Sequence, residues 1–251
     1  MREFDLLING FEVQAQYSEQ TVQGTLLPIL RKLTQLRRAK GRRVIAYLAA
    51  PPAAGKSTLA ASLERLSREC GDLEPIQAVG IDGFHYHQEY ILAHTVIRDG
   101  AELPMKDVKG CPETYDVQKL KRAILALREG VVRWPYYDRR LHDVVEDVTE
   151  LCEGIILLEG NWLLLRQGGW ADLMTYCDYS ILLRAEEPLL RERLIGRKMR
   201  GGLSRDAAER FYETGDGPNV ARCLTHSARG NLNLQLTTEG DILPEEVTPD
   251  L

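Results

Sequence analysis

The segment from Ala50 to Thr58 constrains the fold of this chain more than any other. It reads Ala-Pro-Pro-Ala-Ala-Gly-Lys-Ser-Thr and directly follows the apolar run Val44–Ala49. The phosphate-binding loop pattern G-x-x-x-x-G-K-[S/T] is matched at every fixed position except the first, where Ala50 replaces glycine. Such a loop joins a buried strand to a helix, so we expect a strand at Val44–Ala49 and a helix at Leu59–Glu69.

The residue types of this loop suit a nucleoside triphosphate with its magnesium ion. Backbone N–H groups of the loop and of the first helical turn surround a phosphate chain. The Lys56 ammonium can reach the β- and γ-phosphates, and the Ser57 hydroxyl can be a ligand of Mg²⁺. The residues expected to bind ATP here are Ala53, Ala54, Gly55, Lys56, Ser57 and Thr58.

Apolar runs and amphipathic segments alternate along most of the chain. This order favours an α/β fold with a doubly wound, mainly parallel sheet and helices on both faces. Further buried strands are expected at Pro75–Ile81, Gly154–Gly160, Tyr179–Leu183 and Asn231–Thr237. Apolar side chains recur at helical spacing over residues 18–40. We therefore expect a helical extension at 1–42 and a P-loop domain at 43–251.

Two acidic residues stand where predicted strands end. Asp82 follows Pro75–Ile81, and Glu159 follows four apolar residues. The carboxyl ends of parallel strands meet at one edge of a sheet, so both acids should lie near Gly55. Glu159 is placed to hold Mg²⁺ together with Ser57, directly or through water, and Asp82 is placed to take the proton of an attacking hydroxyl. The alternative is that either acid only caps a turn.

Arginines gather on one face of the predicted helix Pro188–Arg200. Arg193, Arg197 and Arg200 are spaced three or four residues apart and so share a helix face. On a mobile lid such arginines neutralise the charge of a transferring phosphoryl group. We expect Arg193 and Arg197 to contact the nucleotide and Arg197 to act in catalysis. The alternative is a solvated face whose arginines pair with neighbouring glutamates.

Charge and composition argue against several classes of protein. A net charge of −5 and a pI of about 5.7 argue against a nucleic-acid binder, and the basic run Arg37–Arg43 is expected to be a solvated link. No apolar run approaches the roughly 18 residues of a membrane helix. The N-terminus lacks the pattern of a secretory signal, and the five scattered cysteines form no C-x-x-C pair. We therefore expect a reduced protein in the cytoplasm, with no membrane partner.

Several short motifs resemble those of one kinase superfamily. Asp82-Gly83-Phe84 resembles the Asp-Gly-Phe that carries its catalytic acid, and Lys109–Asp116 is similar to the pantothenate kinase run Lys-Gly-Phe-Pro-Glu-Ser-Tyr-Asp. Tyr137–His142 is similar to the Tyr-Asp-x-x-x-His segment of uridine kinases, and Glu159-Gly160 resembles the end of a Walker B strand. Over residues 43–236 the chain resembles the P-loop kinases that include uridine kinase, phosphoribulokinase and type I pantothenate kinase. It most resembles their nucleoside-kinase-like branch, also named for a fructose-transport kinase.

The resemblance implies a P-loop kinase fold with a helical lid and a reaction that uses ATP and Mg²⁺. The γ-phosphoryl group would pass to a hydroxyl of a small metabolite, with Asp82 as the base. Tyr115, Asp138 and His142 are implied to approach this acceptor. Phe84 and His85 follow Asp82 directly and are further candidates for acceptor binding, although His85 could equally be an ordinary loop residue.

The sequence leaves the acceptor and the assembly open. A nucleoside, a sugar and a pantothenate-like molecule all remain candidates, because aromatic and polar residues near the motifs suit each of them. A P-loop NTPase that acts as a regulator or chaperone, without a small-molecule acceptor, is the alternative function. Many related kinases form dimers, so a homodimer is compatible with the resemblance.

Overall fold

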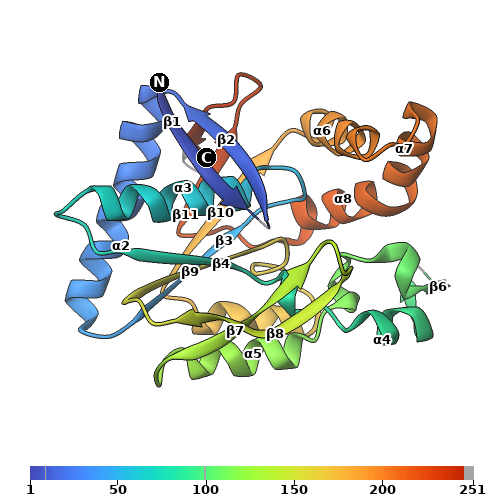
Figure 1. Cartoon of the computed structure of the whole chain (residues 1–251), viewed down its shortest axis with the longest axis horizontal. Helices are drawn as coiled ribbons and strands as arrows, with labels where there is room; N and C mark the ends of the chain where they lie inside the picture. Colours follow the sequence, from blue (N-terminus) through green and yellow to red (C-terminus); the bar gives the residue numbers. More distant parts are fainter. Residues whose placement is uncertain (9, 99, 246–251) are drawn as a thin grey trace, which may run out of the picture.

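The centre of the molecule is a six-stranded sheet with the order β12-β11-β10-β3-β9-β4 (Figure 1). The computed structural model describes residues 1–8, 10–98 and 100–245, so residues 246–251 of the expected P-loop domain lie outside it. The strands are β3 (Val44–Ala49), β4 (Ile76–Gly80), β9 (Ile155–Gly160), β10 (Tyr179–Ala185), β11 (Leu232–Leu236) and β12 (Ile242–Pro244). All neighbours are parallel except β12, which runs antiparallel to β11. The predicted mainly parallel sheet is confirmed.

Helices cover both faces of this sheet, because alternate residues of its strands point to opposite sides. One hydrophobic cluster contains Val44, Ala46, Leu48 and side chains of α2 (Leu27–Lys40), α3 (Lys56–Glu69) and α6 (Glu187–Arg200). The other contains Ile45, Tyr47, Ala49 and side chains of α5 (Val117–Ala126) and the 3₁₀ helix η5 (Gly168–Tyr176). The two clusters lie on opposite faces of β3, as expected for a doubly wound fold.

The first 42 residues differ in part from the expected helical extension. Residues 19–40 are helical as predicted, through α1 (Glu19–Thr21), the π-helix η1 (Val22–Leu26) and α2. Before them, however, β1 (Arg2–Ile8) and β2 (Phe11–Tyr17) form an antiparallel hairpin. Its buried side chains alternate with exposed ones, for example Phe4 and Leu6, and this period belongs to a strand rather than a helix. The hairpin packs on α3 and joins the same core cluster.

A second hairpin covers the outer edge of β4. It consists of β7 (Val132–Asp138) and β8 (Asp143–Leu151). The indole N–H of Trp134 donates to the Gly80 carbonyl at 2.8 Å. The Gln77 amide donates to the Glu150 carbonyl at 2.7 Å and accepts from the Cys152 N–H at 3.1 Å. Side-chain hydrogen bonds thus join this hairpin and the segment after it to β4, the edge strand of the sheet.

The long segment between Phe84 and Asp116 is ordered around a small core of its own. It contains α4 (Gln88–Ala93), β5 (Thr95–Arg98), β6 (Ala101–Pro104) and the 3₁₀ helices η3 (Met105–Val108) and η4 (Pro112–Thr114). The core residues are Ile91, Val96, Met105, Val108 and Cys111. These elements are too short to show a clear period, so sequence periodicity does not reveal them.

Three helices after β10 form the lid region at the right of Figure 1. The chain turns at Gly201–Gly202 after α6 and continues as α7 (Arg205–Phe211), the π-helix η6 (Tyr212–Asp216) and α8 (Gly217–His226). Ser204 caps α7, since its hydroxyl accepts from the Ala207 N–H at 3.3 Å.

The basic run Arg37–Arg43 is more firmly held than the predicted solvated link. Arg42 and Lys40 both pair with the nearly buried Asp178, at 2.9 and 3.2 Å. Arg43 donates to backbone carbonyls, including those of Leu127 and Glu153. Much of the charge of the run is therefore engaged in structural contacts. Within the described ranges, no helix combines the length and the apolar character required to cross a bilayer.

Candidate active site

The loop between β3 and α3 has the backbone shape of an anion-binding turn. Gly55 has a φ of 92° and Ala53 has a φ of 65°, both in the left-handed region. No side chain of the described residues caps the N-terminus of α3. The first N–H groups of a helix have no partner within it, so they are available to a phosphate. Ala50 is fully buried and is not among the described residues with positive φ, so alanine replaces glycine there without backbone strain.

Ser57 and Glu159 form an oxygen pair at the start of α3. The Ser57 hydroxyl donates to Glu159 Oε1 at 2.7 Å. A Cβ on Gly80 would lie 3.1 Å from this oxygen, so the glycine leaves room for the carboxylate. Burial raises the pKa of Glu159, while Lys56 acts in the opposite direction. The two oxygens are ligands of the kind that Mg²⁺ prefers.

The oxygens of Ser57 and Glu159 would supply only part of the coordination of a metal ion. Among the described residues there is no group of three or more His, Cys, Asp or Glu side chains that could hold a metal. Mg²⁺ commonly keeps several waters and binds through one or two protein oxygens plus phosphate oxygens. The pair therefore fits a magnesium ion that arrives with a nucleotide.

Asp82 lies immediately beyond β4, in the 3₁₀ helix η2 (Asp82–Phe84). Strand pairing brings it close to Glu159, because the Ile81 N–H donates to the Glu159 carbonyl at 3.0 Å. Burial alone would raise the pKa of Asp82, but the positive charges of Lys56 and Arg139 and the interaction with His85 lower it below its ordinary value. The Tyr115 hydroxyl also donates to Asp82 Oδ1 at 3.1 Å. The carboxylate is therefore ionised at neutral pH and able to accept a proton.

His85 and Phe84 take different positions beside Asp82. The His85 ring lies on the Tyr115 ring with centroids 3.7 Å apart, and its Nδ1 is 2.8 Å from the Asp82 carbonyl oxygen. Its Nε2 is buried and has no hydrogen-bond partner among the described residues. Phe84, by contrast, is buried against Trp134, with ring centroids 4.7 Å apart. The structure thus places Phe84 in the core, where it supports the turn that carries Asp82.

Asp82 and Glu159 line a cavity of about 280 Å³. Its walls come from β4, from the β7–β8 hairpin and from β1, with Tyr136, Tyr137 and Thr149 among the lining residues. Two carboxylates at one end and aromatic rings beside them suit a hydroxylated molecule of modest size. The cavity lies at the carboxyl ends of the parallel strands, where the sequence predicted the site.

Asp138 and His142 lie at the turn of the β7–β8 hairpin. Asp138 Oδ1 accepts from the backbone N–H groups of Arg140 and Leu141, at 2.7 and 3.1 Å, and so shapes the turn. His142 is exposed with a φ of 55°. Among the described residues, no hydrogen bond or ion pair joins either of them to Asp82. The residue of this turn whose charge acts on both Asp82 and Glu159 is Arg139, which the sequence did not single out as a site residue.

Two of the three lid arginines face the site. Arg193 donates to the Ala53 carbonyl at 3.3 Å and so reaches the phosphate-binding loop. Arg197 is exposed, and the carboxylates of Asp216 and Asp82 favour its charged form. Neither arginine forms an ion pair with a glutamate in the described part of the chain, where Arg191 and Arg205 do so instead. Arg200 is exposed at the end of α6.

The π-helix η6 and the start of α8 bring further polar groups to this region. Asp216 Oδ2, Asn219 Oδ1 and Asn161 Oδ1 are buried and lack hydrogen-bond partners among the described residues. The Asp216 carboxylate favours the charged form of Arg197, and Asn161 directly follows Glu159-Gly160. A search for polar residues just after the second strand-end acid could have found Asn161. The sequence carries no comparable signal for Asp216, at the end of the π-helix η6, or for Asn219, in the first turn of α8, because a π-helix has no sequence period of its own.

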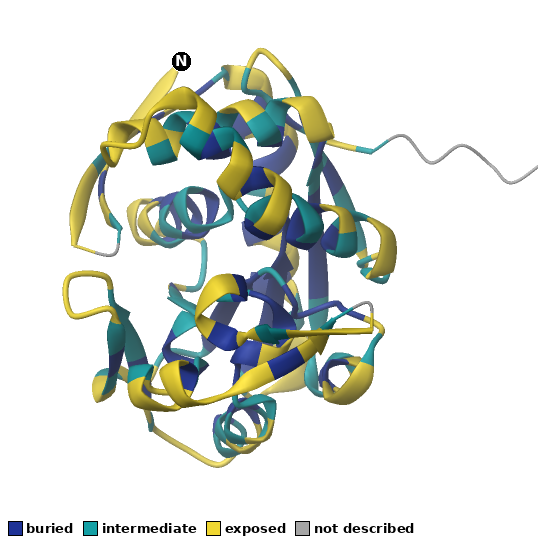
Figure 2. Cartoon of the chain, turned by 90° about the vertical axis from the view of Figure 1, so that its right-hand side faces the viewer, coloured by how far each residue is buried: buried dark blue, intermediate teal, exposed yellow. Residues whose placement is uncertain are grey.

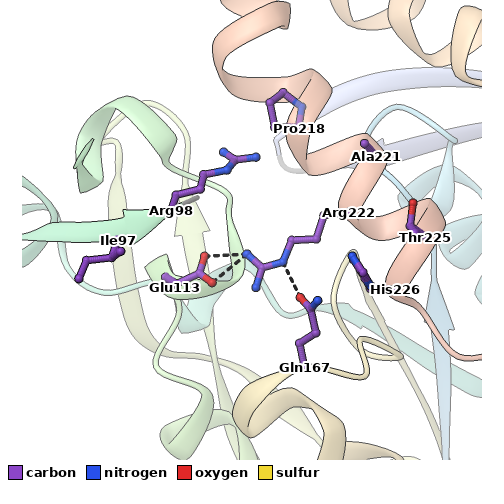
Figure 3. Close-up of a pocket in the computed structure, with 9 residues that line it drawn as sticks. All are labelled: Ile97, Arg98, Glu113, Gln167, Pro218, Ala221, Arg222, Thr225 and His226. Atoms are coloured by element: carbon purple, nitrogen blue, oxygen red, sulfur yellow. Dashed lines mark hydrogen bonds and ion pairs between the residues drawn. The ribbon is translucent and has the colours of Figure 1, made fainter. Parts of the chain in front are cut away.

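A larger cavity of about 500 Å³ lies on the other face of α8 (Figure 3). It is lined by Pro218, Ala221, Arg222 and Thr225, whereas the buried face of α8 carries Asn219 and Cys223. Arg222 pairs with Glu113 at 2.8 Å and donates to Gln167 at 2.8 Å. None of the predicted site residues lines this cavity, so it is separate from the candidate site.

Known proteins resemble this chain over most of its length. The uncharacterised protein YggC of Escherichia coli is 41% identical over 94% of this chain and 96% of its own length. A Schizosaccharomyces pombe protein named "Putative uridine kinase C227.14" is 30% identical over 69% of this chain and 74% of its own length. No family model matches the chain.

Solved structures show the same architecture. A crystal structure of a putative fructose transport system kinase from Silicibacter sp. TM1040 superposes with a TM-score of 0.74 and 27% sequence identity. The match covers 83% of this chain and 98% of the other.

Proposed function

Because this chain belongs to the superfamily of P-loop kinases that includes uridine kinase and pantothenate kinase, we propose that it transfers the γ-phosphoryl group of ATP to a hydroxyl of a small polyhydroxylated acceptor. The observation that carries this proposal is the position of the Asp82 carboxylate, which lines the same cavity as Glu159, the hydrogen-bond partner of Ser57 in the phosphate-binding loop. A P-loop regulator would need the loop and its metal ligands but no base in a cavity of acceptor size.

The residues around the loop divide the work of holding ATP. The first turn of α3 offers N–H donors to the phosphates, and Lys56 supplies a positive charge at the β- and γ-positions. Ser57 and Glu159 would hold Mg²⁺, which in such a complex neutralises phosphate charge and makes the γ-phosphorus more electrophilic. Arg193 and Arg197 approach from the lid and would stabilise the charge that develops during transfer.

Asp82 would bind the acceptor hydroxyl and take its proton as the oxygen attacks phosphorus. Its lowered pKa keeps it in the basic form at neutral pH, and the hydrogen bond from Tyr115 fixes the orientation of one carboxylate oxygen. The second oxygen is left for the acceptor. His85 Nε2, buried without a partner in the described residues, can bind another acceptor hydroxyl.

Buried polar atoms without partners support a polyhydroxylated acceptor. Among those of the described residues are, besides His85 Nε2, the side-chain oxygens of Asn161, Asp216 and Asn219. A buried acceptor atom left unpaired is costly, so a ligand that donates several hydrogen bonds would be favoured. A sugar, or the sugar part of a nucleoside, carries such donors in close succession.

The test is ADP release from Mg·ATP in the presence of single acceptors. The panel contains D-ribose, D-fructose, a sugar alcohol, uridine, glycerate and pantothenate. Turnover should depend on one class of acceptor and fall by roughly two to four orders of magnitude in Asp82→Asn, which keeps the shape of the side chain but not its basicity. Acceptor-independent hydrolysis that is equal in the wild type and in Asp82→Asn would instead favour a P-loop NTPase regulator.

A further inference from the structure

Leu7 interrupts a polar pattern on the outer face of the N-terminal hairpin. On this face Glu3 pairs with Gln16 and Asp5 pairs with Gln14, and their side chains are within hydrogen-bond distance. Leu7 is the next residue on the same face and is 74% exposed. A single exposed leucine is ordinary on a protein surface, so what matters for Leu7 is which residues lie beside it.

The same residue lines the cavity that contains Asp82 and Glu159. Leu7 lies there with Tyr136 and Tyr137, which belong to the β7–β8 hairpin. In Figure 2 the N-terminal hairpin and the β7–β8 hairpin lie one above the other at the left edge of the molecule. The wall of the cavity therefore comes in part from residues that precede the P-loop domain in the sequence.

Resting on the function proposed above, we propose that Leu7 forms one wall of the acceptor site and limits the size of the acceptor. The chemistry of the cavity divides into two parts. The carboxylates of Asp82 and Glu159 serve the reacting hydroxyl and the metal, whereas Leu7, Tyr136 and Tyr137 offer apolar surface to the part of the acceptor that does not react. A compound with hydroxyls at one end and a C–H or ring face at the other fits both parts.

The experiment compares Leu7→Ala and Leu7→Trp with the wild type at saturating Mg·ATP. The kcat/KM values for D-ribose, D-fructose and uridine are measured, together with the KM for ATP. Leu7→Ala should raise the ratio of kcat/KM for uridine to kcat/KM for D-ribose by about tenfold, and Leu7→Trp should lower this ratio by a similar factor. A few carbon atoms in a pocket change selectivity on this scale. If only one compound is accepted, its own kcat/KM should change by that factor. The KM for ATP should stay the same.

Asp5→Ala is the matched control, because Asp5 lies on the same face of β1 but does not line the cavity. Equal melting temperatures of the wild type, the two Leu7 variants and Asp5→Ala would show that the exposed face of β1 tolerates each substitution. Wild-type turnover with selectivity unchanged within twofold in both Leu7 variants would overturn the role of Leu7 and leave the kinase function standing. A wild type that phosphorylates no compound of the panel would overturn the proposed function and, with it, this inference.

Discussion

The Asp82 carboxylate is kept ionised by specific neighbours rather than by water. Burial would favour its neutral form, and the charges of Lys56 and Arg139, the interaction with His85 and the Tyr115 hydroxyl reverse this effect. Tyr115 is itself fixed, because it is buried and packs on His85 and on the edge of Trp170. A base assembled in this way is sensitive to small changes in the residues around it.

Removing the Tyr115 hydroxyl should therefore change the pH dependence of the reaction. The pKa of Asp82 lies below its ordinary value, so activity is lost only as the pH falls through that pKa. Tyr115→Phe removes a donor to the charged form, so the pKa should rise and the acid limb of the kcat/KM profile should move to higher pH by about one unit.

Tyr90→Phe is the control for this change, because Tyr90 stacks on Tyr86 and His94 and, among the described residues, forms no hydrogen bond with Asp82. An unchanged acid limb in Tyr115→Phe would mean that Asp82 is not the group that titrates in the profile.

Among the elements, the lid helices α6 to α8 carry charges toward the phosphate-binding loop and toward Asp82. Arg193 is tied to the loop carbonyl of Ala53, and Arg197 lies in the field of Asp216 and Asp82. These two arginines thus differ in role. Arg193 is already engaged with the loop, whereas the surroundings of Arg197 leave it available for charge that appears during transfer.

Arg197→Ala should lower kcat by about a hundredfold and weaken ATP binding by no more than a few fold, because a charge that acts on the transition state adds little to ground-state affinity. Turnover and ATP titration of the same preparation would separate the two effects. Arg200→Ala, in the exposed last turn of α6, is the control and should change neither value strongly. Equal losses of kcat and affinity in Arg197→Ala would assign Arg197 to ground-state binding.

Local sequence patterns predicted the elements of the proposed nucleotide site, but not those around the proposed acceptor cavity. The phosphate-binding loop, Asp82 and Glu159 were predictable because each follows a continuous apolar strand and parallel strands end at one edge. The β1–β2 hairpin was missed although the sequence carries a signal for it, because Asn9-Gly10 is a turn pair of the strongest kind and alternating residues flank it. Asp138 was placed near the acceptor by its motif, yet its side chain closes a turn, and only the folded backbone shows this.

At the scale of the whole molecule, Asp178 joins parts of the chain that lie far apart in sequence. It is nearly buried and pairs with Lys40, Arg42 and Arg128, at 3.2, 2.9 and 2.6 Å. It also accepts from the Ile45 N–H at 3.0 Å. The residue therefore links the end of α2, the first core strand and the segment after α5.

Asp178→Asn should destabilise the protein by about 2–4 kcal/mol, because it leaves the charges of three basic side chains without their shared partner. Urea unfolding would measure this loss, and kcat of the folded protein should be unchanged. Asp172→Asn is the control, since Asp172 forms a single ion pair with Lys121 and is 66% exposed. A variant of Asp178 as stable as the wild type would show that solvent already screens these charges.

The covered edge of β4 also has a consequence for behaviour at high protein concentration. Sheets with a free edge can add a strand from another chain, and this is a common route to aggregation. Here Trp134 occupies the Gly80 carbonyl, and side chains of α3 accept from the Ile76 and Ala78 N–H groups. At the opposite edge, the backbone of Ile242 in β12 is bound by the hydroxyls of Thr21 and Thr25. In the described part of the chain, few backbone groups at these two edges are left for pairing with another chain, which lowers the tendency of the main sheet to aggregate.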